Sequence, residues 1–222
     1  MKGIFFSIVR RDLRLSVTRG GDAALTFFFF ILAVAIFHFA SPHGGGLEKS
    51  APAILWAASV MASLLSLEAF YHRDAQDGTF DLLLLSRASS LALMTAKVFA
   101  HWLAAGVFVV LAAGLASLMV SIPASAVVTL LAALTLATLY MSLLGGFGAV
   151  LTMGARAPGL LLCLLVLPLY IPMLVFGALA TAASLEGMAA KPYLLLQGAL
   201  VVAILPLSLW AGGAALRMQA RS

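Results

Sequence analysis

Long apolar runs separated by short polar connections are the feature that most restricts how this chain can fold. A helix needs about 20 apolar residues to cross a hydrocarbon core about 30 Å thick. Six runs meet that requirement, and hydrophobic residues make up 64% of the 222 residues. Backbone groups in lipid must form their hydrogen bonds internally, so these runs are expected to be helices. The predicted spans are residues 23–40, 52–70, 98–120, 126–151, 159–183 and 193–216.

The fold class is therefore all-α: a polytopic membrane protein with six transmembrane helices. The connections are too short to hold a soluble domain, so residues 1–222 form a single transmembrane domain. No cleavable signal peptide is evident, because the first apolar run is too long and follows a basic stretch. The single cysteine, Cys163, lies within a span and is expected to act as a small apolar group.

The distribution of cationic residues predicts the orientation. Lysine and arginine accumulate in the cytoplasmic connections of membrane proteins. With six spans, the two termini and every second connection lie on one side of the membrane. These segments hold eleven of the 13 cationic residues, and the connections on the other side hold two. Both termini, and the connection between spans two and three, are therefore expected in the cytoplasm. The net charge of +5 follows from this bias and does not indicate nucleic-acid binding. The eleven are Lys2, Arg10, Arg11, Arg14, Arg19, Arg73, Arg87, Lys97, Arg156, Arg217 and Arg221, and the two are Lys49 and Lys191.

Residues 4–19, within a predicted interfacial region 1–20, show the pattern of an amphipathic helix. The basic side, with Arg10, Arg11 and Arg14, is expected to face anionic lipid headgroups in the cytoplasmic interface. Two interpretations remain open: the helix only anchors the chain, or it also touches a cytoplasmic partner. Its predicted apolar side holds Phe5, Phe6, Val9, Leu13 and Val17.

Residues 67–87, here called the acidic segment, interrupt the apolar pattern between spans two and three. The segment holds Glu68, Asp74, Asp77 and Asp81, which are four of the eight acidic residues in the chain. Asp77 is suited to cap a short helix over about residues 78–85, because its carboxylate can accept from free N–H groups.

Phe80, Leu83 and Leu84 would then form one apolar face of that helix, at i, i+3 and i+4. Such a helix suits a groove in a soluble protein. The alternative is a helix lying on the membrane, which the acidic charge beside an anionic leaflet disfavours.

Intrinsic catalytic or transport chemistry has no support in the sequence. The connection before span two ends in Glu48-Lys49-Ser50, which lacks the glycine of a phosphate-binding loop. The chain is therefore expected not to be an enzyme and to hold no metal or intrinsic cofactor. His38 and His43 are weak candidates for haem ligation at the outer end of span one.

Few polar residues are expected within the spans or at their ends. Glu68 and Lys97 are expected to reach the interface by snorkelling, with a pairing between them as one option, and His101 is expected at the interface. Glycines such as Gly114 and Gly145 are expected to allow close helix packing. Pro52 is expected at the start of span two, and Pro168, Pro172 and Pro206 are expected to kink spans five and six. The length of span five also suggests a short or re-entrant excursion before the last connection.

Three stretches of the sequence carry a resemblance to a known family. They are the acidic segment, residues 96–102 (AKVFAHW) and residues 167–178 (LPLYIPMLVFGA), together with the Arg-Asp-Leu-Arg of residues 11–14. The chain closely resembles the CcmB family, membrane subunits of the ABC-type complex of bacterial cytochrome c maturation. The resemblance covers nearly the entire chain and is most specific at residues 73–78.

The resemblance implies an ABC exporter permease in the bacterial inner membrane that pairs with a cytoplasmic ATPase of the CcmA type, two copies of each. It also implies association with the membrane subunits CcmC and CcmD. ATP hydrolysis would drive release of the haem-loaded chaperone CcmE, with haem as a substrate or a group held by partner subunits. By the same resemblance an interfacial elbow helix covers about residues 4–19, and a coupling helix covers about residues 73–85 within a coupling loop 71–92. The expected ATPase-coupling residues are Arg73, Asp74, Gln76, Asp77, Gly78, Phe80, Asp81, Leu83 and Leu84.

Three rival functions remain as alternatives. One is a passive scaffold or haem-binding subunit, another is a permease for a different substrate, and the third is a secondary transporter. A secondary transporter is disfavoured because no charged residue is expected in the middle of a span.

Overall fold

The computed structural model describes residues 2–18, 22–40, 47–76, 89–120, 122–153 and 155–219. All regular structure in these residues is helical, and six helical units are long and apolar enough to cross a bilayer, which confirms the predicted fold class. Helices α5, η1 and α6 follow one another without a break and together form the third unit. The elements are α1 (Lys2–Thr18), α2 (Asp22–Ala40), α3 (Leu47–Gln76), α5 (Ser90–His101), η1 (Trp102–Gly106), α6 (Val107–Met119), α7 (Ala124–Thr152), α8 (Pro158–Leu185) and α9 (Lys191–Gln219).

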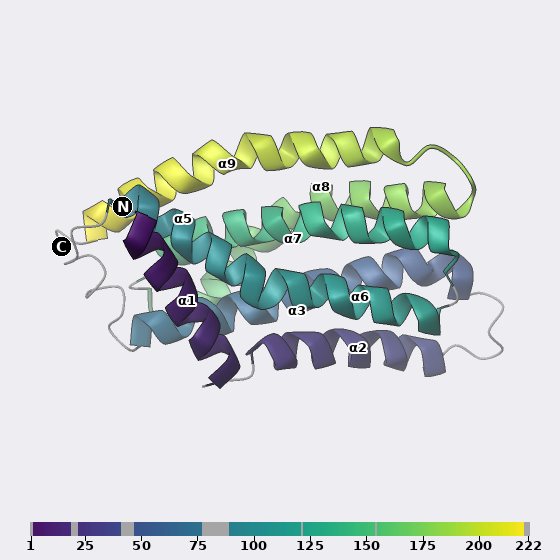
Figure 1. Cartoon of the computed structure of the whole chain (residues 1–222), viewed down its shortest axis with the longest axis horizontal. Coiled ribbons are helices and arrows are strands. Elements are labelled where there is room, and N and C mark those ends of the chain that lie inside the picture. The colour runs from purple at the N-terminus through teal and green to yellow at the C-terminus, as the bar shows by residue number, and fades with distance from the viewer. Residues whose placement is uncertain are drawn as a thin grey trace.

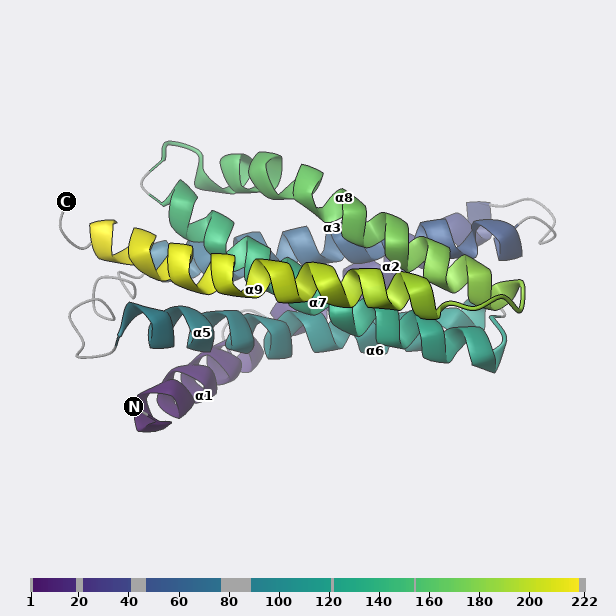
Figure 2. The same ribbon diagram turned by 90° about the horizontal axis from the view of Figure 1, so that it is seen from above.

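The spanning helices run side by side along the long axis of the molecule, and α1 crosses them obliquely near one end (Figures 1 and 2). The C-terminal end of α9 lies at that same end, as do the last turn of α3 and the first turn of α5. A helix over Lys2–Thr18 agrees with the amphipathic helix predicted for residues 4–19. It packs against α5 and more lightly against α2.

Helix α7 forms the centre of the bundle and contacts α3, α5, α6, α8 and α9. In an 18-residue stretch of α7, 56% of the residues are buried, against 22% in stretches of the same length in α2, α8 and α9. The three peripheral helices therefore turn most of their apolar side chains outward, where lipid or another protein covers them. The tight packing against α7 depends on small residues: a Cβ at Gly145 would collide with the Leu67 side chain of α3. A Cβ at Gly114 would make only an ordinary contact, 3.7 Å from Leu131 Cδ2.

Prolines lie inside three of the spanning helices. Helix α8 is continuous through Pro168 and Pro172, so the predicted re-entrant excursion is wrong. Its 28 residues span about 42 Å at 1.5 Å per residue, and tilt or extension into the interface accommodates that length. Helix α9 contains Pro206 and changes direction part-way along (Figure 1), as a proline kink produces. Pro52 lies within α3 and not at its start, because α3 already begins at Leu47.

Side chains from the neighbouring helices bond to the backbone of α8 close to its prolines. Tyr140 of α7 donates to the Leu169 carbonyl at 3.1 Å, and Gln197 of α9 donates to the Met173 carbonyl at 3.1 Å. In return, Tyr170 of α8 donates to the Met141 carbonyl of α7 at 2.8 Å. These bonds fix the proline-containing part of α8 against its two neighbours.

Candidate functional site

Helix α5 carries the polar residues that make up the candidate site. It begins directly after the acidic segment, where Ser89 caps it by accepting the Ala92 N–H at 3.2 Å. Lys97 and His101 stand four residues apart, so they lie on one face of this helix. Both are buried, and both contact residues of other helices.

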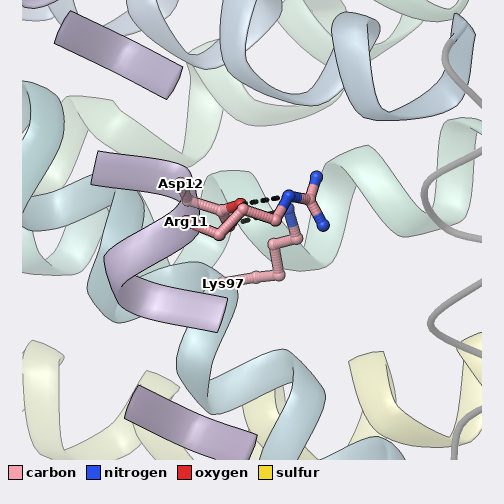
Figure 3. A network of polar contacts seen from close by, with 3 residues as sticks. All are labelled: Arg11, Asp12 and Lys97. Carbon is pink, nitrogen blue, oxygen red and sulfur yellow. Dashed lines mark ion pairs between the residues drawn. The ribbon is translucent and has the colours of Figure 1, made fainter. Parts of the chain in front are cut away.

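Lys97 forms an ion pair with Asp12 of α1. The Lys97 Nζ atom lies 2.8 Å from Asp12 Oδ2, and the two side chains are 1% and 2% exposed (Figure 3). Arg11 Nε stands 3.6 Å from Asp12 Oδ1 with its own side chain 36% exposed, so the carboxylate lies between two cations. Removing one partner of a buried pair leaves an uncompensated charge and destabilises by about 3–5 kcal/mol.

This pairing corrects the expectation that Lys97 snorkels to the interface. The optional pairing with Glu68 is not tested, because the Glu68 side chain lies outside the described part of the chain. Helix α1 lies across α5 and covers the lysine, which then needs a carboxylate inside the packed region. It also changes the buried side of α1. Ile8, Val9 and Asp12 are buried while Phe6 is 68% exposed, so the predicted apolar face is rotated about the helix axis.

His101 bridges three helices one turn further along α5. Its Nε2 atom lies 3.3 Å from Ser66 Oγ of α3, and its Nδ1 atom lies 2.9 Å from Ser142 Oγ of α7. Ser66 already donates its hydroxyl proton to the Ser63 carbonyl at 2.8 Å. We therefore assign Nε2–H as the donor to Ser66, with Nδ1 accepting from Ser142. The predicted interfacial location of His101 is wrong, because serines of α3 and α7 satisfy it inside the bundle.

A π-helical turn, η1, follows His101 immediately. A π turn inserts one residue and shifts the register of the side chains after it, and such turns are frequent at functional sites. Here the Trp102 indole N–H donates to Thr138 Oγ1 of α7 at 3.2 Å. Gly106 closes the turn, where a Cβ would lie only 2.7 Å from Trp102 Cδ1 and 3.1 Å from Thr138 Cβ. Helix α5 and its continuation are thus joined to α1, α3 and α7 within a few turns.

Comparison with known proteins agrees with this architecture. A family model described as "CcmB protein" matches residues 3–219. The chain belongs to the CcmB protein family. It is 39% identical over 219 residues to "Heme exporter protein B" of Pseudomonas aeruginosa, covering 98% of each chain. It is 39% identical over 216 residues to the protein of that name from Paracoccus denitrificans, covering 97% of this chain and 99% of the relative. The Escherichia coli K12 protein of that name is 33% identical over 216 residues, covering 97% and 98%.

The residues expected to couple this CcmB-family chain to an ATPase lie at the edge of the described structure. The backbone at Arg73, Asp74 and Gln76 belongs to the last turns of α3, so a separate coupling helix does not begin at residue 73. Their side chains lie outside the described part of the chain. The same holds for the whole of Asp77, Gly78, Phe80, Asp81, Leu83 and Leu84.

The arginines of the elbow helix line a groove of about 560 Å³. Arg10 and Arg14 are exposed, and they line it together with Arg11, Ser7 and Thr18. Asp12 lies on the buried side of α1, and Arg11 both lines this groove and contacts the Asp12 carboxylate.

The weak haem-ligand candidates are not brought together in the described structure. His38 lies in the last turn of α2, with its ring 5.4 Å from that of Phe39. Its Nδ1 atom is buried and has no hydrogen-bond partner among the described residues. His43 lies outside the described residues.

Sequence patterns do not predict the roles of Asp12, Ser66, Ser142 and Thr138. Asp12 had a usable signal, because it is an acidic residue next to the apolar side of an amphipathic helix. The hydroxyl residues had none, since serine and threonine in membrane helices commonly bond to their own backbone.

Proposed function

We propose that this CcmB-family chain is the membrane permease subunit of an ABC-type complex for cytochrome c maturation in the bacterial inner membrane. Its substrate class is haem, in keeping with the names of its relatives. A separate ATPase of the CcmA type supplies the energy, since the sequence holds no phosphate-binding loop of its own. CcmC and CcmD are the membrane partners, and ATP hydrolysis drives release of haem-loaded CcmE.

The observation that carries this proposal is the position of α5. It starts directly after the acidic segment and is tied to α1 by Lys97, to α3 and α7 by His101, and to α7 again by Trp102. A rigid displacement at the start of α5 therefore moves three other helices of the bundle together. A partner that binds the acidic segment would act on the membrane part through this helix.

The orientation rests on charge. The end that holds α1 and the C-terminal end of α9 is the cationic one by sequence, which supports a cytoplasmic location for both termini. An ATPase in the cytoplasm then meets the acidic segment and the basic side of α1 on one face. Two copies of this chain per complex accord with the large outward-facing apolar surfaces of α8 and α9.

The proposal is tested by co-purification of the complex from membranes. Asp77→Lys and Phe80→Asp are expected to lose the ATPase subunit, or to keep ATP hydrolysis while the yield of mature cytochrome c falls. Glu186→Lys reverses a charge at the opposite end of the bundle, at the C-terminus of α8, and serves as the control that retains both. Unchanged assembly and unchanged cytochrome c yield in both acidic-segment variants would refute the proposal.

A haem-binding subunit without coupling is the competing function. The observation in its favour is that His38 Nδ1 has no hydrogen-bond partner within the described part of the chain. It predicts haem absorbance in the purified chain that disappears in His38→Ala or His43→Ala. It also predicts that the acidic-segment variants leave maturation intact.

A further inference from the structure

An apolar groove of about 380 Å³ opens where α1, α2 and α6 meet. Phe27 and Phe28 of α2 and Phe108 and Leu111 of α6 line it, and Ser16 of α1 lines it on the third side. Phe28 is 67% exposed and Leu111 is 57% exposed, so the groove faces the surroundings of the bundle and not its core. At the depth of the spanning helices those surroundings are lipid.

Ser16 adds a polar group to the otherwise apolar lining of the groove. Its side chain is 3% exposed, and its Oγ atom has no hydrogen-bond partner among the described residues. A buried hydroxyl without a partner is destabilising by about 1–3 kcal/mol, so an acceptor at this position would be favoured. None of the lining residues offers a side-chain ligand for haem iron, because they are serine, alanine, phenylalanine and leucine.

The position of the groove relative to the membrane indicates which kind of ligand it binds. Its polar wall belongs to α1, which crosses the end of the bundle (Figure 1). Ala23, which also lines the groove, is the first residue of the first spanning stretch. The groove therefore runs from the membrane interface into the hydrocarbon region. A phospholipid has the same order of chemistry, with ester carbonyls as acceptors at the interface and an acyl chain below them.

Charge selects the headgroup. The charged residues of α1 whose side chains the structure describes are Arg10, Arg11, Asp12 and Arg14, and Asp12 is paired with Lys97. The helix beside the groove is thus cationic toward the interface, which favours an anionic headgroup. We propose that the groove between α1, α2 and α6 binds one acyl chain of an anionic phospholipid, with Ser16 donating to an ester carbonyl.

The test uses the full chain in vesicles of phosphatidylglycerol and phosphatidylcholine, with a photoreactive diazirine on the acyl chain of one lipid at a time. The phosphatidylglycerol probe is expected to label residues 23–28 and 108–111 well above the exposed face of α9 at Leu196 and Val202. The phosphatidylcholine probe is expected to label them less. Even labelling of all lipid-facing helices overturns the proposal, and equal labelling by the two probes overturns its anionic headgroup.

Variants identify the groove itself. Ala24→Trp fills the groove and is expected to reduce the labelling at least about threefold. The loss of one buried apolar contact with the acyl chain is enough to cause a change of that size. Leu25→Trp, one residue along and outside the groove, is the matched control that leaves labelling unchanged. Ser16→Ala is expected to weaken retention of phosphatidylglycerol about fivefold in native mass spectrometry, the change of one neutral hydrogen bond.

The melting temperature of each variant is the control. A value equal to that of the wild type would show that the variant keeps its fold. Equal labelling of Ala24→Trp and Leu25→Trp contradicts the proposal, and so does haem that protects the groove from the lipid probe.

Discussion

The ammonium group of Lys97 lies 2.8 Å from the carboxylate of Asp12, and both side chains are almost fully buried. This pair joins a helix that crosses the end of the bundle to a spanning helix that leaves the acidic segment. A buried pair of this kind adds little net stability compared with apolar residues, but it specifies which surfaces meet. The position of α1 on α5 is therefore fixed by charge as well as by apolar contacts.

The first prediction concerns this pair. Asp12→Ala or Lys97→Ala breaks this buried pair by removing one of its charges and is expected to destabilise by about 3–5 kcal/mol. Asp12→Leu with Lys97→Leu removes both charges and is expected to recover most of that loss. Thermal unfolding of the purified chain in detergent checks this. Equal melting temperatures for the wild type and both single variants would show that the pair is not buried as described.

The second prediction concerns His101. His101→Ala removes two side-chain hydrogen bonds and leaves a cavity between α3, α5 and α7, for an expected loss of about 2–4 kcal/mol. His38→Ala, at the end of α2, is the control and is expected to change stability by no more than about 0.5 kcal/mol. Melting temperatures measured in the same detergent decide between them. A larger effect at His38 than at His101 would contradict the central role of the His101 bridge.

The third prediction concerns the contact between Gly177 of α8 and Trp56 of α3. A Cβ at Gly177 would fall within the indole ring, so Gly177→Ala is expected to push the helices apart at a loss of about 1–3 kcal/mol. Gly198→Ala on α9 meets nothing within 4 Å and is expected to be neutral or stabilising by up to about 1 kcal/mol. The Trp56 N–H donates to Thr181 at 3.2 Å, and loss of this bond should accompany the change. If both glycine variants melt together, the close approach of α3 and α8 is refuted.

The fourth prediction concerns the π-helical turn. Thr138→Val keeps the shape of the side chain and removes the acceptor of the Trp102 N–H, with an expected loss of about 1 kcal/mol. Thr135→Val, an exposed threonine one turn earlier on α7, is the control without this contact. If coupling runs through α5, Thr138→Val also lowers cytochrome c yield at unchanged assembly. An equal yield in the two threonine variants would restrict the turn to a structural role.

Apolar length determined most of the fold. The six spans follow from runs of about 20 residues, because hydrocarbon leaves a chain no alternative to the helix among these patterns. The exact ends did not follow. The third spanning unit begins at Ser90 and not at residue 98, so Lys97 falls two turns inside a helix and not at its start. A polar residue near the boundary of an apolar run suggests that the membrane span ends there. The span can nevertheless continue past that residue when another helix covers its side chain.

The sequence by itself determined the membrane class, the six spans, the amphipathic helix at the N-terminus and the asymmetry of charge between the two ends. Each of these depends on the composition and periodicity of a single segment, because they decide how that segment partitions between lipid and water. Only the tertiary structure decided that Asp12 meets Lys97, that His101 lies between Ser66 and Ser142, and that Ser16 borders an apolar groove. These pairings join residues on different helices, and their geometry depends on how the helices cross, which no local pattern encodes.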